Sequence, residues 1–92
     1  QLQTLSTFIE QQKIEHIDLL KIDCEGAELR VLQGISPQHW QLIHQIVAEV
    51  HDVENRLQTF TNICKQHGFA NIVVEKDHLM GDTPLYNVFV TR

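Results

Sequence analysis

The stretch that decides the fold is IDLLKIDCEGAELRVLQGI, residues 17–35. An apolar run at residues 17–22 ends in an acidic turn, and a helical pattern of apolar residues follows at once. This order predicts a buried strand, a short loop and a helix, with Asp23 and Glu25 at the carboxyl end of the strand. In open α/β sheets, that end of a strand is where ligands bind.

The rest of the chain continues the alternation of helices and strands. Helical spacing predicts helices at residues 4–13, 26–33, 37–42 and 52–67. Apolar and alternating runs predict strands at residues 17–23, 45–51, 69–76 and 85–91. Thr4 or Ser6 is a candidate cap for the first helix, and Gly34 is expected to end the second in a left-handed conformation.

This order of elements predicts an α/β fold. Strands separated by helices are expected to be parallel neighbours with right-handed crossovers. The last two strands have only a polar connection between them, so they should form an antiparallel hairpin. We therefore expect a mostly parallel sheet with a C-terminal antiparallel hairpin and with helices on its faces.

The composition describes a globular chain without a strong electrostatic preference. Of its 92 residues, 42% are hydrophobic and 21% are charged, which fits one folded domain or part of one. The net charge of −5 and the lack of a Lys or Arg run argue against binding to nucleic acid or to an anionic membrane. No apolar segment is long enough to cross a bilayer. Because Cys24 and Cys64 are far apart in sequence, we expect reduced thiols and a cytoplasmic protein.

Four side chains form the candidate catalytic site. Asp23 and Glu25 alternate along the first strand end, and Glu49 and His51 alternate along the next. If these strands are parallel neighbours, their carboxyl ends bring all four side chains into one region. Two uses remain open. Asp23 or His51 could act as the base that deprotonates a substrate hydroxyl, or the carboxylates could hold Mg²⁺, Ca²⁺ or Mn²⁺.

Structural roles compete with each of these assignments. Asp23 could cap the helix that begins near Glu25, and both Glu25 and Glu28 lie in the first helical turn, where the helix dipole favours acids. Glu49 stands among apolar residues, so its burial would need a partner. His51 could be an ordinary histidine at a strand end.

One family resemblance covers nearly the whole chain. KIDCEGAELRVLQG, residues 21–34, resembles the signature segment of FkbM-type methyltransferases, and AEVH, residues 48–51, resembles the end of the family's next strand. These proteins are similar to S-adenosylmethionine-dependent enzymes with a seven-stranded Rossmann-like sheet. The resemblance implies that residues 1–92 are a single partial domain, the C-terminal half, with the strands counted fourth to seventh.

The resemblance also implies that cofactor binding and the rest of the site are shared between two halves of a longer chain. The glycine-rich loop and the acid that holds the cofactor ribose should lie upstream, since the four glycines here are widely separated. S-adenosylmethionine would be bound mainly by that other half, so no cofactor-binding residue is assigned here. The implied reaction is O-methylation of a small molecule such as a sugar or polyketide-like product, and the fragment alone should be inactive.

A second hypothesis is a non-catalytic α/β module that serves association or scaffolding in a larger protein. Without the missing half, the strand at residues 17–22 lies at the edge of the sheet and is apolar on both faces. Because such an edge can pair with another chain, we expect the fragment to associate with itself or to be only marginally stable.

Overall fold

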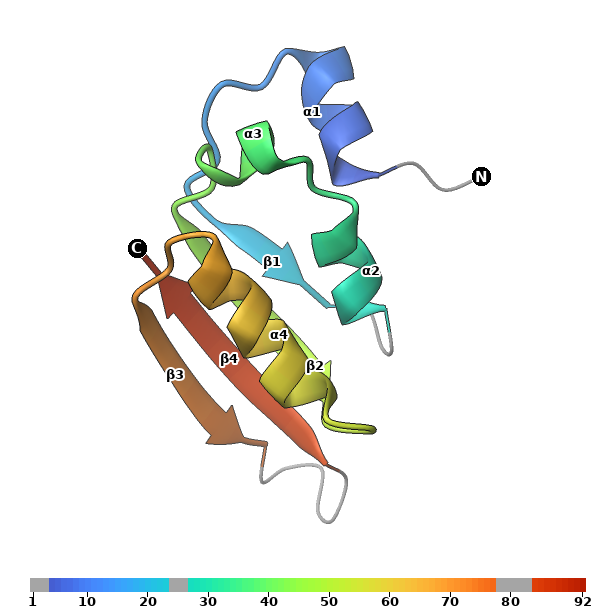
Figure 1. Cartoon of the computed structure of the whole chain (residues 1–92), viewed down its shortest axis with the longest axis vertical. Coiled ribbons are helices and arrows are strands. Elements are labelled where there is room, and N and C mark those ends of the chain that lie inside the picture. Colours follow the sequence, from blue (N-terminus) through green and yellow to red (C-terminus); the bar gives the residue numbers. More distant parts are fainter. Residues whose placement is uncertain (1–3, 24–26, 78–83) are drawn as a thin grey trace.

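The computed structural model describes residues 4–23, 27–77 and 84–92. Four strands form one sheet, and the helices lie beside it (Figure 1). The elements are, in chain order, α1 (Leu5–Gln12), β1 (Leu20–Ile22), α2 (Glu28–Gln33), α3 (Pro37–Trp40), β2 (Gln45–His51), α4 (Arg56–Gln66), β3 (Asn71–Lys76) and β4 (Leu85–Thr91). No helix in the described ranges is long and apolar enough to cross a membrane.

The strand order is β1-β2-β4-β3, which confirms the hairpin but not the mostly parallel sheet. β1 and β2 are parallel, whereas β4 is antiparallel to both β2 and β3. The expectation failed because it assumed that β2 and β3, which α4 separates in sequence, would be neighbours. β4 instead lies between them, so the described strands form one parallel pair and two antiparallel pairs.

Burial alternates along β2 and defines the two faces of the sheet. Ile46, Ala48 and Val50 are buried, whereas the residues between them are partly exposed. The buried face packs against α2 and α4. We call the opposite side the open face. From the register and the alternation of side chains, its central residues are Lys21, Val47, Glu49, Asn87, Phe89, Val73 and Glu75.

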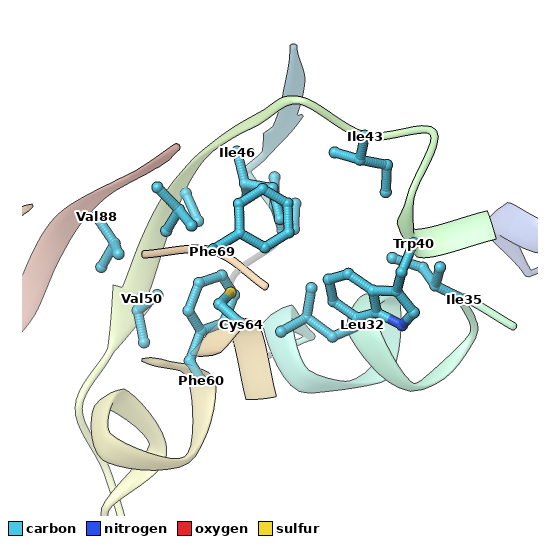
Figure 2. Close-up of a cluster of buried hydrophobic side chains, with 13 residues drawn as sticks. Leu32, Ile35, Trp40, Ile43, Ile46, Val50, Phe60, Cys64, Phe69 and Val88 are labelled. Carbon is cyan, nitrogen blue, oxygen red and sulfur yellow. The ribbon is translucent and has the colours of Figure 1, made fainter. Parts of the chain in front are cut away.

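The core lies between the buried face and the helices (Figure 2). Phe60 and Cys64 of α4 meet Leu32 of α2 there, and all three are buried. Trp40 closes one end of this cluster, where its ring stacks on His67 with centroids 4.1 Å apart. Cys64 is a free thiol, and burial raises its pKa to about 12, so it is an apolar packing residue rather than a nucleophile.

The start of α1 and the end of α2 meet closely. The Thr4 hydroxyl accepts a hydrogen bond from the Thr7 backbone N–H at 3.1 Å, as predicted for a cap. Gly34 does not take the predicted left-handed conformation, because its φ is −85°. A Cβ at Gly34 would lie 3.1 Å from the Thr4 Cβ, so close approach of the two segments explains the glycine.

β1 is shorter than predicted but lies at the predicted edge. The regular strand covers three residues, and an isolated parallel bridge between Ile17 and Ile43 precedes it. Leu19, just before β1, leaves 52% of its surface exposed. The edge therefore combines a strand that is paired on one side with an exposed apolar side chain.

We expect Leu19→Lys to weaken self-association of the 92-residue chain, because a charge beside an edge strand opposes pairing with another chain. Sedimentation velocity over a concentration series measures the effect. Val53→Lys is the matched control, since Val53 is also exposed and apolar but lies after β2, outside the edge. A wild-type chain that sediments as a clean monomer and melts sharply at high temperature would contradict the expectation.

Candidate functional site

Asp23 and Glu49 meet at the carboxyl ends of the two parallel strands. Ile22 pairs with Ala48, and both side chains are buried on the same face. The next residue of each strand therefore turns to the open face, where the side chain of Asp23 lies close enough to Glu49 to raise the pKa of that carboxyl.

The environment of Glu49 favours its protonated form. The pKa of Glu49 is raised above the ordinary value of 4.5, chiefly by the hydrogen bond with Asp23. Burial and the negative charges of Asp23 and Asp77 act in the same direction, whereas the positive charge of Lys21 acts against them. Asn87 stands opposite Glu49 on β4. The raised pKa makes the Glu49 carboxylate a better proton acceptor than an ordinary glutamate.

His51 lies two residues beyond Glu49 and therefore on the same face of β2. Its side chain is partly exposed, which leaves the imidazole accessible from that face. The backbone N–H of His51 donates a hydrogen bond to Oε2 of Glu28 at 3.2 Å. The predicted convergence thus holds for Asp23 and Glu49, with His51 next to them along β2. Glu25, the fourth predicted member, lies outside the described residues.

Asp23 does not cap α2. The residue before α2 is Ala27, which has no side chain able to bond the free N–H groups, and the helix begins only at Glu28. The predicted capping role assumed that the helix starts near Glu25. Because the described helix begins five residues after Asp23, the Asp23 carboxylate is instead directed to Glu49.

Glu28 is the residue whose importance sequence reasoning missed. Its side chain is fully buried, with 0% exposed. Besides the bond from His51, Oε2 lies 3.8 Å from Nη1 of Arg56, whereas Oε1 is buried without a hydrogen-bond partner in the described part of the chain. The sequence does contain a signal, because Glu28 is four residues before Leu32 and so shares the buried side of α2.

The metal hypothesis finds no support in the described ranges. No group of three or more His, Cys, Asp or Glu side chains is arranged there to hold a metal ion. Glu25 was not part of that search, because it lies outside those ranges. The proton-transfer alternative, in contrast, has a defined carboxyl pair.

Comparison with known proteins identifies the family to which this chain belongs. The model of the methyltransferase FkbM domain matches residues 1–82. The chain belongs to the FkbM methyltransferase domain family. Its resemblance to that family at residues 21–34 and 48–51 therefore reflects true membership, and the domain is a methyltransferase domain.

Curated relatives of the FkbM domain are much longer than this chain. The 31-O-demethyl-FK506 methyltransferase FkbM of Streptomyces tacrolimicus is 42% identical over 88 residues, which are 96% of this chain and 34% of that protein. Methyltransferase 1 of Beauveria bassiana is 35% identical over 89 residues, 96% of this chain and 36% of that protein. The AMB antimetabolite synthetase AmbE of Pseudomonas aeruginosa is 34% identical over 96 residues, only 4% of its length. No solved structure matches the chain.

We expect the raised pKa of Glu49 to depend on Asp23. Asp23→Asn removes a negative charge and supplies an amide donor that favours the carboxylate, so the pKa of Glu49 should fall toward 4.5. NMR titration of the side-chain carboxyl carbons measures the change. Asp18→Asn is the control, since Asp18 precedes β1 at its other end. An unchanged Glu49 titration in Asp23→Asn would mean that the two carboxyl groups are not coupled.

Proposed function

We propose that this chain is the C-terminal part of an S-adenosylmethionine-dependent O-methyltransferase. The acceptor we propose is a hydroxylated small molecule, such as a sugar or a polyketide-like product. The observation that carries the proposal is the parallel register that brings Asp23 and Glu49 together at the carboxyl ends of β1 and β2, in a domain of a methyltransferase family. The carboxyl ends of β1 and β2 and the open face would provide a place for an acceptor.

The carboxyl pair would supply the proton transfer. An acceptor hydroxyl placed against the pair would donate its hydrogen bond to the ionised carboxylate, which takes the proton as the new C–O bond forms. When bound to the parent protein, S-adenosylmethionine would supply a methyl group that is poised for displacement from its sulfur. Most of the rate gain comes from holding the two reactants in line, and the base adds to it.

His51 would complete the acceptor side. From its place two residues beyond Glu49, the imidazole can bind a second polar group of the acceptor or serve as an alternative base. Lys21, on the same face, offsets part of the negative charge. We retain Glu25 as a further candidate on the basis of its sequence position alone. No step through a metal ion is proposed.

The cofactor would be held mainly by residues outside this chain. A cofactor of this kind needs close backbone approach at a glycine-rich turn, and the four glycines of this sequence are too widely separated to form one. The chain spans 34% and 36% of the two relatives described first. We propose that the four strands are the fourth to seventh of a Rossmann-like sheet, whose first strand would pair with the free edge of β1.

The proposal also includes a partner for the open face and a cellular compartment. The rest of the parent chain would be the principal partner of the open face, where Val73 and Phe89 are exposed apolar residues. The free thiol of Cys64 fits a reducing compartment, so we place the parent protein in the cytoplasm.

We expect the parent protein to bind S-adenosylmethionine and the 92-residue chain to bind it weakly or not at all. Isothermal titration calorimetry on both proteins measures this, with circular dichroism to establish that the shorter chain is folded. Tight binding by the folded 92-residue chain would contradict the proposal that residues outside this chain hold the cofactor, because the cofactor contacts would then lie within residues 1–92.

We expect Asp23→Asn and Glu49→Gln in the parent protein each to lower the rate of methyl transfer by roughly 100-fold or more, since each removes part of the proton-accepting pair. Transfer of labelled methyl groups to a panel of hydroxylated sugars and macrolactones, including 31-O-demethyl-FK506, measures the rate. Glu75→Gln is the matched control, because Glu75 lies on the same face two strands away. Folded variants with unchanged activity would favour the non-catalytic scaffold instead.

A further inference from the structure

The burial of Glu28 is costly in stability. A buried carboxylate loses its hydration, and its partners must offset that loss. Glu28 is fully buried, yet among the described residues it has one hydrogen bond and one ion pair at 3.8 Å, and its second oxygen has no partner there. Buried ion pairs can often be replaced by apolar side chains without loss of stability. The contacts of Glu28 therefore point to a role in placing other groups.

Those contacts join three elements at one end of the sheet. Glu28 is the first residue of α2, His51 is the last residue of β2, and Arg56 is the first residue of α4. All three meet at a single oxygen, Oε2 of Glu28. The carboxylate thus fixes the end of β2 relative to the two helices that follow β1 and β2.

The end of β2 needs such support because its parallel neighbour is shorter. β1 ends at Ile22 opposite Ala48, three residues before the end of β2. The N–H of Asp52 donates to the Pro84 carbonyl, on the β4 side, at 2.8 Å. Successive N–H groups of a strand point to opposite sides, so the N–H of His51 points to the β1 side, beyond the end of that strand. Glu28 supplies the acceptor there.

We propose that Glu28 is a positioning residue that holds the projecting end of β2, through the His51 N–H, so that Glu49 stays against Asp23. Glu49 lies between two fixed points, namely Ala48, which pairs with Ile22, and His51, which Glu28 holds. The catalytic meaning of this role rests on the proposed function, in which the pair of Asp23 and Glu49 accepts the proton of the acceptor hydroxyl.

Two substitutions of Glu28 by side chains of nearly equal volume distinguish the loss of its hydrogen bond from the loss of packing or of charge. Glu28→Gln and Glu28→Met both remove the charge opposite Arg56 and both fill the buried space. Only Gln can still accept the hydrogen bond from His51. Ser6→Ala is a control at the other end of the sheet, where the buried Ser6 hydroxyl bonds the backbone N–H of Ser36 and the ring of His39.

The experiment is NMR on the isotope-labelled parent protein, with two readouts at the end of β2. In Glu28→Met, we expect the His51 amide to exchange about tenfold faster or more and the pKa of Glu49 to move toward its ordinary value. Both readouts should stay near wild type in Glu28→Gln and in Ser6→Ala. A change in melting temperature alone, with both readouts unchanged in Glu28→Met, would overturn the proposal.

Activity separates a failure of this inference from a failure of the proposed function. In the methyl-transfer assay, Glu28→Met should raise the KM of the acceptor or lower kcat, with the affinity for S-adenosylmethionine unchanged. Equal weakening of acceptor and cofactor would indicate general loosening and count against positioning. A wild-type protein that methylates none of the panel would count against the proposed function, while the NMR result would still decide whether Glu28 places Glu49.

Discussion

The parallel register of β1 against β2 is the constraint on which the rest of the structure depends. Ile22 and Ala48 pair and are both buried beneath the helices, so the residues that follow them, Asp23 and Glu49, emerge together on the other face. A slip of one residue would turn Glu49 toward the core, where an unpaired carboxylate is strongly unfavourable. Burial of two apolar side chains therefore fixes the position of two polar ones.

The elements that sequence alone could place best are those with strong local patterns. β2 and β4 have the predicted bounds, because each is a short stretch rich in β-branched or aromatic residues that is bounded by polar or turn-forming residues. The order of the strands could not be predicted, because the insertion of β4 between β2 and β3 depends on contacts between residues that are far apart in sequence. Val88 and Val90 of β4 are buried at the centre of the sheet, whereas Val73 and Val74 of β3 are exposed at its edge. All four are valines in similar local sequences.

The candidate site shows the same division between local and long-range information. The meeting of Asp23 with Glu49 could be predicted, because it requires only that two strand ends run parallel. The role of Glu28 could not, because its main partner is a backbone N–H that belongs to a residue 23 positions away. Residue types and their spacing predict contacts between side chains. The contact to Glu28 is made by the backbone N–H of His51, a group that every residue except proline has, so the sequence does not reveal it. The one usable signal was an acid on the buried side of a helix.

The open face links the chemistry of the site to its surroundings. The carboxyl pair shares this face with the exposed apolar side chains of Val73 and Phe89, in a family whose members are far longer than this chain. A segment that covers the apolar side chains also removes water from the carboxyl pair. Desolvation disfavours the ionised form, so the pKa of Glu49, already raised, would move further upward, with the charge of Lys21 opposing it. A carboxylate whose pKa is closer to neutrality is a stronger base for a hydroxyl proton. In the proton transfer proposed above, the packing of the open face would therefore help to set the strength of the base.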